Sequence, residues 1–167
     1  MVSKIQNKIK NIKLVLTDVD GVLTDGGMYY SSDGEYMKKF NTRDSMGMEL
    51  LLNNEIKTVL VTRENSKIVK KRVQKIKTVD LYSGVLNKKE LLPEILETYN
   101  VQSNQVAYIG DDVNDIDIMK SVGFSATPSD GNYCVKEIAD HICDLKGGDG
   151  VFREFADMIL KFTLKTQ

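Results

Sequence analysis

The sequence has few of the residues on which several common kinds of chemistry depend. Its 167 residues include one histidine, two cysteines, two prolines and no tryptophan. The single histidine, His141, leaves almost no material for histidine-based acid–base catalysis or for a zinc site. Cys134 and Cys143 form no C-x-x-C pair, which argues against a disulfide scaffold and favours two plain thiols.

Long apolar runs and a strong net charge are also missing. No run approaches the roughly 20 apolar residues of a membrane span, and residues 1–10 lack the apolar stretch of a secretory signal. The 23 basic and 24 acidic residues give a net charge of −1, so no global field attracts nucleic acid or an anionic membrane. We therefore expect no nucleic-acid or membrane partner and, by default, a cytoplasmic location. One local basic run is interpreted as a solvated helix face: Lys67, Lys70, Lys71, Arg72, Lys75 and Lys77.

What the sequence does contain is an alternation of strand-like and helix-like patterns. Short apolar runs at 14–16, 59–61 and 106–109 are typical of buried strands in a parallel sheet, and 79–82 is a weaker candidate. Apolar residues recur at helical spacing in the segments 46–52, 68–76, 91–99 and 151–162. The alternation predicts a single α/β domain over residues 1–167, with a doubly wound parallel sheet and helices on both faces.

One segment, residues 26–40, interrupts this alternation. Its aromatic-rich arms flank Ser32-Asp33-Gly34, and Asp-Gly between such arms is a strong signal for a β-hairpin. A two-stranded hairpin is only marginally stable by itself in water. We therefore expect the hairpin to pack on another surface, although its own small domain offers little surface for this contact.

Polar residues follow the four candidate strands, at the sheet edge where such folds bind ligands. In chain order these residues are Asp18 and Asp20, then Thr62, then Lys88, then Asp111 in the acidic loop 110–115. Taken alone, the aspartates are typical of a loop, Thr62 of a helix cap and Lys88 of a solvated surface. The order and the placement of the whole set favour a common site.

The chemistry that these groups fit is phosphoryl transfer. Asp18 and Asp20 are two residues apart at a strand end, so both carboxylates face one side. A divalent cation or a proton relieves their repulsion, and acidic oxygens are hard ligands that suit Mg²⁺. Asp18 can form an aspartyl-phosphate, and Asp20 can protonate the leaving alcohol and later activate water. Thr62 suits a phosphate oxygen, and Lys88 can neutralise phosphate or the nucleophile.

These residues resemble the haloacid dehalogenase-like superfamily of phosphohydrolases, whose pattern is D-x-D-G, then Thr or Ser, then Lys, then G-D-D-x-x-D. The resemblance implies that Asp18 is the nucleophile and Asp20 the acid–base group, with Thr62 and Lys88 as phosphate contacts. It also implies a Mg²⁺ ion held by the Asp18 side chain, the Asp20 backbone carbonyl and Asp111.

The similarity extends over about residues 13–162. The hairpin and the segments 19–26, 40–44 and 147–154 resemble the capless subfamily of these phosphohydrolases. That subfamily includes 3-deoxy-D-manno-octulosonate 8-phosphate phosphatases and sialic-acid-type 9-phosphate phosphatases. It implies no cap domain, and a homotetramer in which hairpins associate and a neighbouring subunit helps to close each site. Arg153 and the 147–150 loop resemble the tail that reaches an active site there.

The resemblance implies a small-molecule substrate, an acidic 3-deoxy-ulosonate sugar phosphate. After Thr62 the chain reads Arg63-Glu64, where octulosonate enzymes typically have Gly-Arg and sialic-acid-type enzymes can have Gly-Glu. Glu64 therefore favours a nine-carbon 9-phosphate, with octulosonate 8-phosphate as the alternative, while Arg63 departs from the usual glycine. Arg72 matches an arginine of the second helix that meets the substrate from its own or a neighbouring subunit.

Two hypotheses of another class are weaker. A receiver-type phospho-acceptor domain also gathers acids, Thr and Lys around Mg²⁺, but it has no counterpart of Asp20 two residues after the nucleophile, and no hairpin. A non-catalytic relative would have no reason to keep the complete set of catalytic residues.

Overall fold

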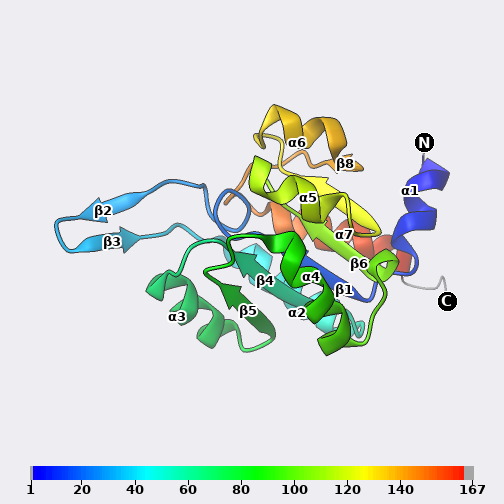
Figure 1. The fold of residues 1–167 in the computed structure, drawn as a ribbon, viewed down its shortest axis with the longest axis horizontal. Helices are drawn as coiled ribbons and strands as arrows, with labels where there is room; N and C mark the ends of the chain where they lie inside the picture. The colour runs from blue at the N-terminus through cyan, green and yellow to red at the C-terminus, as the bar shows by residue number, and fades with distance from the viewer. Residues whose placement is uncertain (1, 164–167) are drawn as a thin grey trace.

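A computed structural model of the protein describes residues 2–163, which form a central parallel sheet of six strands flanked by helices (Figure 1). The strands lie in the order β5-β4-β1-β6-β7-β8, and all adjacent pairs are parallel. They are β1 (Leu14–Thr17), β4 (Lys57–Thr62), β5 (Val79–Ser83), β6 (Val106–Ile109), β7 (Phe124–Thr127) and β8 (His141–Ile142). This arrangement confirms the predicted doubly wound α/β fold.

Helices cover both faces of the sheet, as Figure 1 shows. They are α1 (Val2–Ile9), α2 (Thr42–Asn53), α3 (Lys67–Ile76), α4 (Lys88–Tyr99), α5 (Ile116–Met119), α6 (Tyr133–Ile138) and α7 (Val151–Thr163). No helix among residues 2–163 is long and apolar enough to cross a lipid bilayer.

The two cores follow from the alternation of side chains along the strands. In β1, Val15 packs in the core that α2, α3 and α7 complete, whereas Leu14 and Leu16 pack in the core that α4, α5 and α6 complete. All four residues of β1 are buried, because the strand lies between β4 and β6 in the middle of the sheet. The motif that contains Asp18 and Asp20 therefore follows a buried strand in the middle of the sheet.

The hairpin is formed by β2 (Tyr29–Ser31) and β3 (Gly34–Met37), which pair antiparallel and protrude from the body (Figure 1). Gly34, just after the Ser32-Asp33 turn, has a φ of +112°, which a glycine adopts without strain. The described chain between β1 and α2 forms only this hairpin and its flanking loops, with one bridge, Thr24 to Phe40, at the base. The predicted hairpin is thus confirmed.

Strands β7 and β8 and helices α1, α5 and α6 were not expected from the sequence. Strand β7 reads Phe-Ser-Ala-Thr, and three of its four residues are small, although all four are buried. The weak candidate at 79–82 is the edge strand β5, whose residues after Val79 are half-buried or exposed. In β5 and β7, the neighbouring strands of the sheet stabilise a short segment whose own residues give only a weak strand signal.

Candidate active site

The candidate site lies at the carboxyl edge of the sheet, where the strand order reverses direction. From β1 the chain builds β4 and β5 on one side and then crosses to β6 on the other. Clefts form at such switch points, because the loops that follow the two central strands turn in opposite directions. The cleft here has a volume of about 290 Å³. Its lining residues are Asp18, Asp20, Gly21, Gly26, Thr62, Arg63, Glu64, Asp111, Asp112 and Asn114.

Asp18 is held from below by a buried lysine. Lys88 Nζ, at the start of α4, lies 2.7 Å from Asp18 Oδ2 and 2.6 Å from Asp115 Oδ1. The Tyr108 hydroxyl donates to the same Asp115 oxygen at 2.6 Å, and the Val19 N–H donates to Asp18 Oδ1 at 2.7 Å. Lys88 and the Val19 N–H fix the Asp18 carboxylate, and Asp115, held by Tyr108, fixes Lys88, so the predicted nucleophile is pre-positioned.

Negative charge exceeds positive charge in this part of the cleft. Burial and the nearby Asp115 charge raise the pKa of Asp18 to about 7. Burial, with Asp18 and Asp115 beside it, raises the pKa of Asp111 to about 8. One carboxylate oxygen from each of Asp18, Asp111 and Asp115 lies within 4.8 Å of the others, and among residues 2–163 Lys88 is the one basic side chain that forms ion pairs with this cluster. The oxygens suit a hard divalent cation, whose charge would offset this repulsion.

Asp115 was missed among the site residues, although it is the last acid of the G-D-D-x-x-D pattern. Both of its oxygens already have partners: Oδ1 bonds Lys88 and Tyr108, and Oδ2 accepts the backbone N–H of Asp111 at 3.0 Å. Asp115 therefore orients the loop that carries Asp111. The predicted cation ligands Asp18 and Asp111 keep carboxylate oxygens that face the cleft.

Gly21 allows the two halves of the acidic cluster to approach each other. Its φ is +81°, and a Cβ built on it would lie 2.0 Å from Asp111 Oδ2. From behind, Gly147 packs so closely that its Cβ would lie 2.1 Å from the Gly21 carbonyl oxygen, and Gly148 N–H donates to the Val22 carbonyl at 2.9 Å. The 147–150 loop, which the resemblance associates with a tail, thus packs against the loop that follows Asp18 in the same chain.

Asp20 also lines the cleft, is more exposed than Asp18, and pairs with a different lysine. Lys38 Nζ lies 2.5 Å from Asp20 Oδ1 and 3.1 Å from Glu35 Oε1. The Thr24 hydroxyl donates to Asp20 Oδ1 at 3.2 Å. Lys38 was not predicted, because it follows the hairpin and not a strand of the sheet. The sequence offered no signal for it beyond a lysine in an aromatic-rich segment.

Thr62 and Glu64 enter the cleft from the β4 side. Thr62 is the last residue of β4 and is buried, and its Oγ1 accepts the Glu64 N–H at 3.2 Å. Arg63, between them, is exposed at the cleft rim. The structure therefore brings Asp18, Asp20, Thr62, Lys88 and Asp111 together, with Glu64 beside them.

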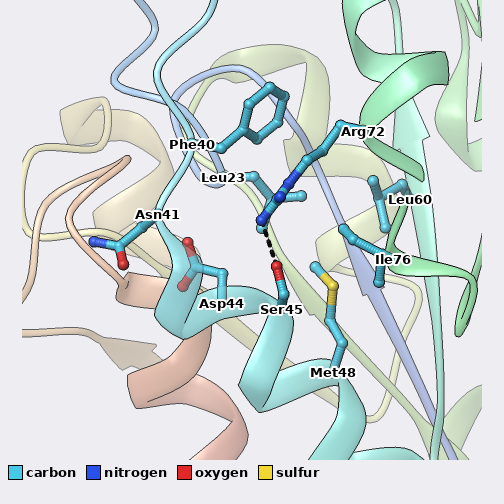
Figure 2. A pocket seen from close by; sticks show the side chains of 9 residues that line it. All are labelled: Leu23, Phe40, Asn41, Asp44, Ser45, Met48, Leu60, Arg72 and Ile76. Atoms are coloured by element: carbon cyan, nitrogen blue, oxygen red, sulfur yellow. Dashed lines mark hydrogen bonds between the residues drawn. The ribbon is translucent and has the colours of Figure 1, made fainter. Parts of the chain in front are cut away.

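Arg72 and Arg153, in contrast, lie outside the cleft of their own chain. Figure 2 shows Arg72 in a small cavity between α2 and α3, where its guanidinium lies 5.6 Å from the Phe40 ring centre and donates to the Ser45 hydroxyl. Arg153, on α7, pairs through Nε with Asp157 at 2.8 Å and borders a separate groove. Neither arginine reaches Asp18 within one chain.

Comparison with known proteins agrees with this geometry. Residues 8–155 match the family described as haloacid dehalogenase-like hydrolases. The chain belongs to this family. A relative from Haemophilus influenzae, a 3-deoxy-D-manno-octulosonate 8-phosphate phosphatase, is 37% identical over 156 residues, which are 93% of this chain and 87% of the relative. The capless-phosphatase resemblance is thereby confirmed.

Solved structures of the family superpose closely on the fold. The cobalt-bound deoxy-D-mannose-octulosonate 8-phosphate phosphatase of Haemophilus influenzae has a TM-score of 0.90 and 36% identity, covering 93% of this chain and 91% of that one. A Moraxella catarrhalis 3-deoxy-D-manno-octulosonate 8-phosphate phosphatase, solved with a magnesium ion, a phosphate ion and KDO, has a TM-score of 0.92 and 30% identity, with coverages of 97% and 93%.

Proposed function

We propose that this protein is a Mg²⁺-dependent phosphatase that hydrolyses 3-deoxy-D-manno-octulosonate 8-phosphate through an aspartyl-phosphate on Asp18. The observation that carries the proposal is the convergence of Asp18, Asp20, Thr62, Lys88 and Asp111 on one cleft. Phosphoryl transfer needs an in-line nucleophile, charge neutralisation and an acid–base group, and the cleft offers one candidate for each.

The substrate assignment departs from the one that Glu64 favoured. Both the curated relative from Haemophilus influenzae and the Moraxella catarrhalis structure are named as eight-carbon octulosonate 8-phosphate phosphatases. These likenesses support the eight-carbon sugar over the nine-carbon 9-phosphate, which becomes the alternative. A single residue beside Thr62 is weaker support than similarity along nearly the whole chain.

In the first step, an Asp18 carboxylate oxygen attacks the phosphorus while the sugar alcohol leaves. Lys88 keeps the Asp18 carboxylate in place, and the Thr62 hydroxyl and nearby N–H groups bind phosphoryl oxygens. Asp20 gives its proton to the leaving oxygen, so the sugar departs as a neutral alcohol. Mg²⁺, held by the Asp18 side chain, the Asp20 carbonyl and Asp111, would supply positive charge against the phosphoryl oxygens.

In the second step, Asp20 acts as a base. Having lost its proton to the leaving group, it accepts one from a water molecule, whose oxygen attacks the phosphorus of the aspartyl-phosphate. The bond between Asp18 and phosphorus breaks, inorganic phosphate leaves, and both aspartates return to their starting states. Asp20 lines the cleft and is partly exposed, so water can reach it for this second role.

We also propose that the hairpin joins the chain into a homotetramer. Its exposed apolar side chains support this: Met28 is 59%, Tyr30 61% and Tyr36 72% exposed. Such a contact would also offer Arg72 or Arg153 a route to the cleft of a neighbouring subunit. Replacing Tyr30 and Tyr36 together by serine should lower the native mass, whereas the same change at Tyr133, 73% exposed on α6, should not. An unchanged mass for the hairpin variant would contradict the assembly.

Turnover measurements test the function directly. Phosphate release from octulosonate 8-phosphate and from a nine-carbon ulosonate 9-phosphate is compared as kcat/KM, with Mg²⁺ and after chelation. We expect turnover that requires Mg²⁺ and a higher kcat/KM for the eight-carbon substrate. An equal or reversed preference would overturn the substrate, and a stably phosphorylated chain without turnover would favour a receiver-type domain.

A further inference from the structure

Lys38 is a buried lysine whose ammonium forms ion pairs with two carboxylates among residues 2–163. Its side chain is 2% exposed, and its ammonium lies between Asp20 Oδ1 at 2.5 Å and Glu35 Oε1 at 3.1 Å. Burying an ammonium is costly unless it is paired and hydrogen-bonded. The residue therefore has a fixed position, and that position lies against the predicted acid–base group.

The contact makes the two oxygens of Asp20 unequal. Oδ1 accepts from both Lys38 Nζ and the Thr24 hydroxyl. Oδ2 is buried and has no hydrogen-bond partner among residues 2–163. Charge-assisted hydrogen bonds are strong and directional, so the carboxylate cannot rotate freely to exchange its oxygens.

The same contact determines where a proton on Asp20 must lie. An ammonium has three donors and no acceptor, so a proton on Oδ1 would point at another donor. Because Lys38 can only donate to Oδ1, a proton on Asp20 is favoured on Oδ2, which has no hydrogen-bond partner among residues 2–163. Asp20 itself lines the cleft beside Asp18.

We propose that Lys38 is a positioning residue for the acid–base step: it holds Oδ1 so that Oδ2 donates the proton to the leaving oxygen of the substrate. The inference rests on the proposed phosphatase function. Lys38 acts through Asp20 and does not contact the reacting atoms.

The contact also links the cleft to the hairpin. Glu35 lies in β3 and, besides Lys38, bonds the hydroxyl of Ser66, the residue that caps α3 just after Glu64. The chain of contacts from Asp20 through Lys38 and Glu35 to Ser66 thus ties the loop after β1 to the loop after β4. If Lys38 had a purely structural role, it would only hold these two loops together. An experiment must therefore distinguish this loop contact from an effect on proton transfer by Asp20.

Two substrates with different leaving groups distinguish proton transfer from the loop contact. A sugar alkoxide needs a proton as it departs, whereas p-nitrophenolate is stable without one. The comparison uses kcat/KM, which covers the steps up to formation of the aspartyl-phosphate and excludes its hydrolysis. Lys38→Met should lower kcat/KM for the sugar phosphate by roughly 10²-fold, the usual size of a general-acid contribution. For p-nitrophenyl phosphate it should stay near the wild-type value, and Lys38→Arg should restore part of the loss.

Lys39 provides the matched control. It is the next residue, its side chain is 54% exposed, and it pairs at 3.0 Å with Asp149 on the surface. Lys39→Met should leave kcat/KM for both substrates, and the native mass, as in the wild type. If Lys38→Met does not fold, Glu35→Gln takes its place, because it weakens the anchoring of Lys38; a smaller loss confined to the sugar phosphate is then expected.

Two results would overturn the inference while leaving the function intact. In the first, Lys38→Met lowers kcat/KM equally for both substrates, which would indicate a structural tie. In the second, it changes neither, although wild-type turnover persists and Asp18→Asn abolishes it. Absence of wild-type turnover on every phosphate monoester would instead overturn the proposed function, and this inference with it.

Discussion

Two lysine–carboxylate pairs flank the cleft, and they are built from different parts of the molecule. Lys88 belongs to α4 in the body of the fold and contacts Asp18, whose side chain is 7% exposed. Lys38 follows the protruding hairpin and contacts Asp20, whose side chain is 24% exposed. The proposed nucleophile is therefore fixed by the sheet and its helices, whereas the proposed acid–base group is fixed by the segment that follows the hairpin.

The two pairs also differ in how many other groups depend on them. Removal of Lys88 would leave Asp18 and Asp115 side by side in the interior without a counter-ion. Removal of Lys38 would leave Asp20 and Glu35, both of which are partly exposed and can be hydrated. We call Lys88–Asp18 the inner pair and Lys38–Asp20 the outer pair. The inner pair should thus matter for folding as well as for catalysis, and the outer pair mainly for catalysis.

The largest effect should come from the carboxylate of the inner pair. Asp18→Asn keeps the size of the side chain but removes the nucleophile, so kcat for the sugar phosphate should fall by at least roughly 10⁴-fold. Phosphate release measures this loss, and Asp117→Asn, on the exposed side of α5, is the control. Substantial turnover by Asp18→Asn would show that the inner pair does not carry the nucleophile.

The lysine of the inner pair should give the next effect. Lys88→Met should lower kcat by about 10²-fold or more, because Asp18 loses the group that orients it. It should also lower the free energy of unfolding by about 3–5 kcal/mol, as for other broken buried ion pairs. Denaturant unfolding of Lys88→Met and Lys38→Met side by side tests the comparison, which fails if the hairpin variant loses as much stability.

The smallest expected effect is a change in metal affinity with pH. Because burial raises the pKa of Asp18 to about 7 and of Asp111 to about 8 in the metal-free protein, Mg²⁺ must displace protons from them near neutrality. Apparent affinity should therefore rise between about pH 6 and pH 8 and level off above that. Calorimetric titration at several pH values, in buffers of different ionisation enthalpy, measures both the affinity and the protons released.

The same shifts predict how the metal-free protein responds to pH. The folded-state pKa values of Asp18 and Asp111 lie above the ordinary value of 3.8, so the native state binds more protons than the unfolded one. The free energy of unfolding should then fall as pH rises from about 4 to about 8.

Asp20→Asn should leave the proton release on Mg²⁺ binding unchanged, since Asp20 is proposed to offer only its backbone carbonyl. A decrease would place its side chain in the metal site.

The inner pair was predictable from sequence because its members adjoin regular elements of the sheet. Asp18 directly follows β1, Thr62 ends β4, Asp111 lies two residues after β6, and Lys88 begins the helix after β5. Parallel strands bring such positions to one edge, whatever the details of the loops. The buried strands that carry them were clear from their apolar runs.

The contact between Lys38 and Asp20 was not predictable, because the periodicity of helices and strands does not determine the direction in which a hairpin projects. Lys38 reaches Asp20 only through the path of the chain from β3 back to α2. The roles expected of Arg72 and Arg153 came from resemblance, and within one chain the structure places both arginines away from Asp18. Contacts that depend on a loop's direction or on a second subunit leave no trace in local spacing.

The glycine loop behind Gly21 has a consequence for the order in which the protein is made. Gly147 and Gly148 press on the loop of the Asp18 motif, yet a ribosome synthesises that motif long before this support. A nascent chain that stalls before the 147–150 segment would contain every proposed catalytic residue and still lack the backing of its nucleophile loop. Hydrolysis should therefore require the 147–150 segment to be synthesised and packed, although none of the proposed catalytic residues lies in it.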